Sequence, residues 1–350
     1  MAQITTGLVG NPTAHYSFSY DSSLQRTATN PSGPEPARTN ALIQASEGDF
    51  NWMSGLFGNP GLDYRLPCTV QVTQNGGGAS WSLGGGNLSV TLNPGLTGST
   101  TMLRYLLVSE MTEQFMREQG RGWYGTNTEG SNGEGLSRFL AARHLANNGL
   151  GFPPANFDNS NLWMNSPRND FINNINPTDD GPDAITGCSL LFIYYLFSQL
   201  GYTENQIVGA GATTPAGVYK NLTGDVGDPF PNFKALVDTR YPGTATIPGP
   251  DLDNPFPISV SRAVQVWSWD GWGWGTFDIA FPFGSNVVNR HSRVEVSICE
   301  LGGRPLDYPF IGAATMSVLN VAPADDGAVH VRFEIQWPSA LQWRAAFFIS

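Results

Sequence analysis

The strongest constraint on the fold is a block of helical sequence in the middle of the chain. Its first segment carries apolar residues at spacings of four and ends in glycines: Leu103, Leu107, Met111, Phe115, Gly120 and Gly122. That spacing places the apolar side chains on one face of a helix, and glycine commonly ends a helix. Further helices are predicted at about 134–147, 185–200, 203–210 and 215–222. The middle of the chain is therefore helical.

Strand-like patterns flank this block on both sides. Within residues 68–92, three alternating or β-branched runs are separated by glycine triplets at 76–78 and 84–86, which predicts a small antiparallel sheet. Over 257–350, strand-like stretches recur at intervals of roughly ten to fifteen residues, which predicts an antiparallel β-sandwich. The expected fold class is α+β, with a helical core and small sheet followed by an all-β sandwich.

The composition suggests four segments. Residues 1–60 are rich in Thr, Ser, Asn, Pro and Gly, and we expect an extended N-terminal arm with little regular structure. Residues 61–225 form the helical domain with its small sheet. Residues 226–256 carry many prolines and glycines, as a linker would. Residues 257–350 form the β-sandwich.

Charge and hydropathy exclude several classes of partner. The formal net charge is −11 and no cluster of Lys and Arg exists, which argues against nucleic acid and anionic membranes as partners. No run approaches the roughly 18 apolar residues of a membrane span, and the first residues do not resemble a signal peptide. We expect a soluble protein, in a compartment that the sequence leaves undetermined. Cys68, Cys188 and Cys299 lack CxxC spacing, so they are expected to be isolated thiols.

The candidate chemistry lies in the sequence Ser109-Glu110-Met111-Thr112-Glu113 and in the glycine-rich connection that leads to Glu134. This layout resembles the active-site helix pair of the gluzincin-type zinc metallopeptidases, and the likeness covers about residues 100–225. In that family two histidines of a His-Glu-x-x-His motif bind zinc, the glutamate between them activates water, and a glutamate on the next helix is the third ligand. The resemblance places Glu110 at the general-base position and Glu134 at the third ligand. Ser109 and Glu113 replace the histidines, so a conventional zinc protease is not expected.

Three alternatives stay open for this site. Glu113 and Glu134, with Ser109, would offer oxygen donors, which suit Ca²⁺, Mg²⁺ or Mn²⁺ better than Zn²⁺. Without a cation, three converging carboxylates (Glu110, Glu113 and Glu134) would have to share a proton, and one could act as a general acid. In the third alternative Glu110 and Glu113 face solvent or pair with arginines at helical spacing: Arg104, Arg117 and Arg138.

The C-terminal region concentrates tryptophan. Trp267, Trp269, Trp272 and Trp274 fall within eight residues. The DGWGWG turn is predicted to raise Trp272 and Trp274 on a loop, and with Trp269 they are the candidate ligand contacts, because tryptophan stacks on sugar rings and anchors protein interfaces. Trp337 and Trp343 bring the number of C-terminal tryptophans to six. The alternative role is to fill the core, which we expect for at least three of the six.

The last strands, from Thr276 to the C-terminus, resemble the H-type lectin domain. The likeness rests on MSVLNVAPADDGAVHVRFEIQW and the closing strand WRAAFFIS, with Phe347 or Phe348 where the family has a tryptophan. It implies trimers that bind galactose-type sugars at subunit edges.

Together these patterns predict a non-peptidase binding protein: a degenerate metallopeptidase-like domain carrying a lectin-like β-sandwich that recognises a glycan or a protein. One alternative is a hydrolase in which Glu110, Glu113 and Glu134 perform acid–base chemistry, assisted by a hard divalent cation. The other is a structural or assembly protein, in which the N-terminal arm and exposed aromatics form homo-oligomer contacts.

Overall fold

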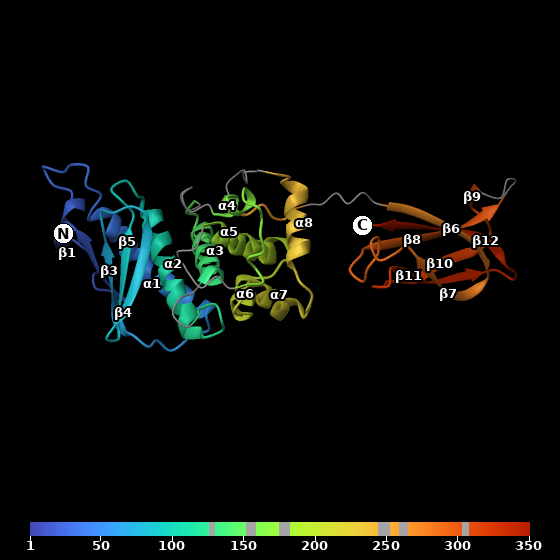
Figure 1. Cartoon of the computed structure of the whole chain (residues 1–350), viewed down its shortest axis with the longest axis horizontal. Coiled ribbons are helices and arrows are strands. Elements are labelled where there is room, and N and C mark those ends of the chain that lie inside the picture. The colour runs from blue at the N-terminus through green and yellow to red at the C-terminus, as the bar shows by residue number, and fades with distance from the viewer. Residues whose placement is uncertain (126–129, 152–158, 175–182, 244–252, 259–264, 303–307) are drawn as a thin grey trace. The chain divides into compact units, whose positions relative to one another are not determined.

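The computed structural model describes residues 1–125, 130–151, 159–174, 183–243, 253–258, 265–302 and 308–350. The chain divides into two compact units, Met1–Ile258 and Ser259–Ser350. The first contains both helices and strands and the second contains strands, so the expected α+β class is confirmed (Figure 1). In the described part of the chain, no helix has the length and hydropathy needed to cross a membrane.

A five-stranded mixed sheet lies in the first unit. Its strands are β1 (Gln3–Ile4), β2 (Tyr16–Asp21), β3 (Arg65–Val72), β4 (Gly78–Gly84) and β5 (Asn87–Asn93), in the order β1-β2-β3-β5-β4. The predicted antiparallel pairing is wrong for β3, which runs parallel to both β2 and β5. The reason is the position of β5, which lies between β3 and β4 and is joined to β4 by a tight turn at Gly85 and Gly86, with φ angles of 61° and 75°. This turn makes β4 and β5 an antiparallel pair. Strand β4 forms the edge of the sheet, and β5 lies beside β3.

The helices of the first unit follow the sheet strands in sequence or connect them. They are η1 (Ser22–Leu24), α1 (Ala37–Leu56), α2 (Thr100–Gln119), α3 (Gly130–Asn147), α4 (Ser160–Met164), α5 (Asp183–Tyr194), the π-helical η3 (Tyr195–Gln199), α6 (Glu204–Gly209), α7 (Pro215–Thr223) and α8 (Phe230–Arg240). The five helices predicted between residues 101 and 222 are confirmed. The hydroxyl of Ser99 accepts a hydrogen bond from the Met102 amide and caps α2, which ends at Gly120 with φ 65°.

Two segments that were predicted to be irregular are helical. The expected extended arm, residues 1–60, contains β2 and the 20-residue helix α1. Most of its prolines precede position 37, and beyond them apolar side chains recur on one buried face: Leu42, Ile43, Phe50 and Met53. The expected linker, residues 226–256, contains α8, because Phe233 and Val237 lie one turn apart and are fully buried.

The second unit consists of two open sheets. Its strands are β6 (Gln265–Gly273), β7 (Gly275–Pro282), β8 (Val294–Gly302), β9 (Tyr308–Phe310), β10 (Thr315–Pro323), β11 (Ala328–Gln336) and β12 (Leu341–Ile349). One sheet has the order β10-β11-β7 and the other β6-β12-β8-β9, with antiparallel pairing throughout. All but the short β9 were predicted.

One aromatic core joins the two sheets of this unit. Phe281 on β7 and Phe347 on β12 have ring centroids 4.6 Å apart, and Phe333 on β11 lies 5.6 Å from Trp343 on β12. All four rings are almost completely buried. On the neighbouring strand β6, Gly271 lies directly opposite Trp343, and a Cβ at this position would lie 2.3 Å from the indole Cζ2. The glycine in the DGWGWG sequence is therefore required by the packing of that ring.

Candidate functional site

The Ser109–Glu113 sequence lies in the middle of α2, and Ser109 lies on the side that packs against α3. The Ser109 hydroxyl donates a hydrogen bond to the Ser137 hydroxyl of α3 over 3.2 Å, and Ser137 donates to the main-chain oxygen of Glu134 over 3.1 Å. Both serines are buried. The two helices that the sequence singled out are thus in direct contact through hydroxyl groups at this level.

Glu110 and Glu113 are buried carboxyls one turn apart on α2, with exposed fractions of 9% and 4%. The Oε2 atom of Glu113 accepts a hydrogen bond of 2.8 Å from the indole Nε1 of Trp81, which lies on the edge strand β4. The Trp81 ring lies against Tyr124, with centroids 6.1 Å apart. A buried carboxyl group needs such donors to offset the loss of hydration. The contact therefore joins the edge of the sheet to α2.

Glu134 occupies the first turns of α3 and forms an ion pair within that helix. Its Oε1 accepts a hydrogen bond of 2.6 Å from Nε of Arg138, four residues later. Arg138, one of the three arginines considered as partners of Glu110 and Glu113, is thus an ion-pair partner of Glu134. Arg104 and Arg117, the other two candidates, pair with Asp49 and Asp63.

The described residues do not form a cluster of side chains that would support the hypothesis of a hard cation. Ser109, Glu113 and Glu134 all belong to this part of the chain. Within it, no group of three or more His, Cys, Asp and Glu side chains is arranged to hold a metal ion. The catalytic and metal roles of these residues stay predictions.

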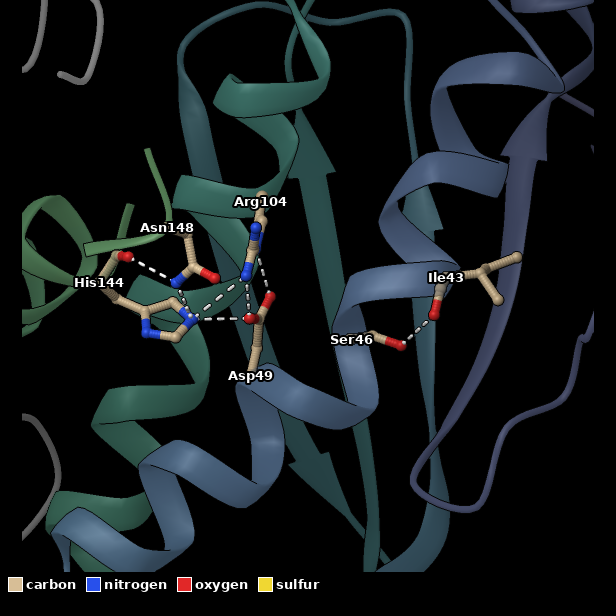
Figure 2. Close-up of polar contacts among 6 residues, drawn as sticks. All are labelled: Ile43, Ser46, Asp49, Arg104, His144 and Asn148. Atoms are coloured by element: carbon tan, nitrogen blue, oxygen red, sulfur yellow. Dashed lines mark hydrogen bonds and ion pairs between the residues drawn. The ribbon is translucent and has the colours of Figure 1, made fainter. Parts of the chain in front are cut away.

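A polar cluster that the sequence did not indicate lies where α1, α2 and α3 meet (Figure 2). Arg104 donates to both carboxylate oxygens of Asp49, over 2.7 Å from Nε and 2.5 Å from Nη2. The Nε2 atom of His144 lies 2.6 Å from Oδ1 of the same aspartate. The Trp52 ring stacks on the imidazole at 4.1 Å. Asp49 and His144 are buried. Helices α1, α2 and α3 each contribute one polar or charged side chain to this cluster: Asp49, Arg104 and His144.

Electrostatics favour an ionised Asp49. Burial by itself would raise the pKa of this carboxyl, but hydrogen bonds from His144 and Arg104, together with their charge, outweigh it and lower the pKa below its ordinary value. The hydroxyl of Ser46, one turn earlier on α1, donates 3.0 Å to the main-chain oxygen of Ile43 and points away from His144 (Figure 2). This serine is therefore no nucleophile for a His–Asp pair, and the cluster acts as a joint between three helices.

The C-terminal tryptophans divide into core and surface residues. Trp343 is buried, and Trp269 is half-buried against the rings of Phe281, Phe283 and Phe347. Trp272 and Trp274 expose 66% and 60% of their surface.

Three expectations about these tryptophans need correction or comment. Trp272 belongs to strand β6, and Trp274 alone lies between β6 and β7, so the predicted loop is shorter than expected. Trp267 and Trp337 expose 40% and 37%, so three core tryptophans are not found among the six. The ligand contact predicted for Trp269 is untested, and its ring is occupied by core packing.

Polar groups surround Trp272 on the outer face of the β6-β12 pair. Gln342 lies directly opposite it in the register, and Asp270 lies opposite Arg344 two residues further along. Arg344 donates to both oxygens of Asp270, over 2.6 and 2.8 Å, and lowers the pKa of that carboxyl. The Oε1 atom of Gln342 is covered and has no hydrogen-bond partner in the described part of the chain. An exposed indole thus lies beside planar hydrogen-bonding groups.

Comparison with known proteins identifies no relative: no family model, curated protein or solved structure matches the chain.

Proposed function

We propose that this protein is a non-peptidase binding protein that recognises a glycan through its C-terminal unit, a lectin-like β-sandwich. In this proposal the first unit is a degenerate metallopeptidase-like domain. The observation that carries the proposal is the pair of solvent-exposed indoles, Trp272 and Trp274, two residues apart at the β6–β7 corner. Tryptophan is enriched where proteins bind their partners, because its ring combines a large apolar face with a polar N–H group.

The surroundings of Trp272 favour a sugar over a purely apolar partner. The apolar face of a sugar ring stacks on an indole, and its hydroxyls need donors and acceptors nearby. Gln342 and the Asp270–Arg344 pair provide both kinds of group on the same sheet face.

The absence of peptidase activity in the proposal is supported by the residues of α2. Ser109 and Glu113 stand where the resemblance requires zinc-binding histidines, and both are engaged in hydrogen bonds with Ser137 and Trp81. A serine hydroxyl is a poor zinc ligand, and a glutamate alone does not reproduce a two-histidine site.

A glycan array with the full chain tests the proposal. We expect binding to at least one glycan class, and loss of that binding in the double variant Trp272→Ala/Trp274→Ala. The matched control is Trp337→Ala, which removes a less exposed indole from the same unit and should leave binding unchanged. Absence of binding to every glycan, or equal binding by the double variant, would overturn the glycan proposal. If the chain binds a protein partner and no glycan, and the double variant loses that binding, the ligand of the tryptophans is a protein and not a sugar.

A further inference from the structure

The outer face of the β10-β11-β7 sheet is hollowed into a depression of about 420 Å³. It lies on a different sheet from Trp272, which belongs to β6. Four polar side chains line it, together with two alanines: Asp278, Asn320, His330, Arg332, Ala280 and Ala322. We call this depression the sheet-face pocket. Its volume falls within the range of small-molecule sites in proteins.

The strand register explains why the surface is hollow here. His330 on β11 lies between Ala280 on β7 and Ala322 on β10, so small side chains flank the imidazole on both sides. A bulge in β10 between Val318 and Asn320 shifts the register and leaves two consecutive residues, Leu319 and Asn320, facing solvent. Bulges change the aim of side chains in this way and are common beside functional sites.

The next cross-strand row provides hydrogen-bonding groups of both kinds. Arg332 lies between Asp278 and Asn320, and it donates to both oxygens of Asp278 over 2.8 and 2.9 Å. This bidentate pair holds two planar groups in fixed positions, one cross-strand row away from His330 and its flanking alanines. Asn320 and His330 each add a donor and an acceptor.

The charge of the pocket selects among ligand classes. The opposite charges of Asp278 and Arg332 cancel, and with His330 counted as neutral the lining carries no net charge. An anion would meet Asp278 within a chain of net charge −11, and a cation would meet Arg332. A neutral polyol avoids both penalties, and its adjacent hydroxyls match planar groups that donate and accept hydrogen bonds.

We propose that the sheet-face pocket binds an uncharged sugar ring, with its C–H face on Ala322 and its hydroxyls on Asn320, His330 and the Asp278–Arg332 pair. This inference rests on the proposed function of the C-terminal unit as a glycan-binding module. It adds a second subsite, formed by residues that the tryptophan pair does not include.

The test is a titration of the full-length protein, labelled with ¹³C at alanine methyl groups, with the methyl glycosides of galactose, glucose, mannose and N-acetylglucosamine. We expect saturable shifts of the Ala280 and Ala322 methyl signals with at least one of these neutral sugars. Asn320→Ala should weaken that binding by about tenfold, as expected for the loss of one or two hydrogen bonds. Glucuronic acid and sialic acid should bind more weakly than the neutral sugars.

Two substitutions by tyrosine provide a matched pair. Ala322→Tyr fills the pocket from an exposed strand position and should abolish sugar binding there. Thr276→Tyr places the same side chain on the exposed face of β7 outside the pocket lining and should leave binding intact. Folding of both variants is checked by thermal unfolding.

The outcomes separate this inference from the proposed function. If Ala322→Tyr binds neutral sugars as well as the natural sequence does, or if an acidic sugar is preferred, the sheet-face pocket is not the site. If glycan binding disappears in Trp272→Ala/Trp274→Ala and persists in Ala322→Tyr, the proposed function stands and this inference fails. If glycan binding disappears in Ala322→Tyr and persists in Trp272→Ala/Trp274→Ala, the sheet-face pocket is the binding site and the two tryptophans are not. Absence of any sugar binding overturns both.

Discussion

His144 on α3 and Asp49 on α1 lie 95 positions apart in the sequence, yet Nε2 of the imidazole is 2.6 Å from Oδ1 of the carboxylate. The same oxygen accepts a hydrogen bond of 2.5 Å from Arg104 on α2. Three helices therefore share one buried carboxylate, and its loss would leave a guanidinium and an imidazole without their acceptor. Asp49 is therefore a residue whose replacement should cost stability.

Replacing Asp49 by asparagine should destabilise the protein by about 3 kcal/mol, since removal of one partner leaves the other charge buried and unpaired. Urea denaturation measures the change. The control is Asp325→Asn, which breaks the exposed ion pair between Arg290 and Asp325 in the C-terminal unit and should change stability far less. Equal effects of the two substitutions would contradict the role assigned to Asp49.

The effect of Asp49 should also depend on pH. Because the folded-state pKa is lowered, the contribution is complete above the unfolded-state pKa of about 4 and disappears as the pH falls through the folded value. The difference in unfolding free energy between the natural sequence and Asp49→Asn should therefore shrink as the pH falls below about 4. A difference that stayed constant down to acid unfolding would show that the carboxylate charge is not what matters.

Glu118, near the end of α2, should produce a pH dependence of opposite sign. Burial, together with its contact with Asp63, raises the pKa of this carboxyl to about 7. The folded state then holds a proton that the unfolded chain releases near pH 4.5, so stability falls as the pH rises from about 4.5 to about 7.

Glu118→Gln tests this assignment, because the amide cannot titrate. Unfolding free energies at pH 5 and pH 8 should differ less in this variant than in the natural sequence. Asp63→Asn should act in the same direction, since it removes the neighbouring negative charge. A carboxyl signal of Glu118 that titrates at its ordinary value in NMR would refute the assignment.

Gly271 should tolerate no side chain. A Cβ at this position would lie 2.3 Å from Cζ2 of the buried Trp343, so Gly271→Ala forces the indole or the strand to move. We expect destabilisation of about 1–3 kcal/mol, as for other overpacked cores. Ser268→Ala, an exposed position on the same strand, is the control and should have little effect. Thermal unfolding that is unchanged in Gly271→Ala would contradict the packing.

The parts of the fold that could be predicted are those specified by local periodicity. The four-residue spacing from Leu103 to Phe115 is enough to define α2, and alternation is enough to define the C-terminal strands. The missed helix α1 has its buried residues masked by polar neighbours and by the proline-rich segment before Ala37. Parallel pairing of β3 with β5 depends on which strands meet after the turn at Gly85, and local pattern carries no information on that.

The same distinction applies to the candidate sites. The sequence indicated that Trp272 and Trp274 would be exposed, but it placed both on a loop, whereas Trp272 is exposed on the outer face of strand β6. The joint of Asp49, Arg104 and His144 brings together residues from three helices, one of which was not predicted. The partner of Glu113 is likewise distant in sequence: Trp81 belongs to the sheet edge, 32 positions earlier.

That last pairing yields a test of the hydrolase alternative. Trp81→Phe removes one hydrogen-bond donor from the buried Glu113 carboxyl and should destabilise the protein by about 1–3 kcal/mol, the magnitude expected for a hydrogen bond to a charged group. Glu113→Gln keeps an acceptor at the same place and should cost less.

In a binding protein, neither Glu113→Gln nor Glu110→Gln alters glycan binding. If the natural protein hydrolyses a peptide or glycoside library and either glutamine variant loses that activity while remaining folded, the carboxylates of α2 are catalytic and the non-enzymatic proposal is wrong.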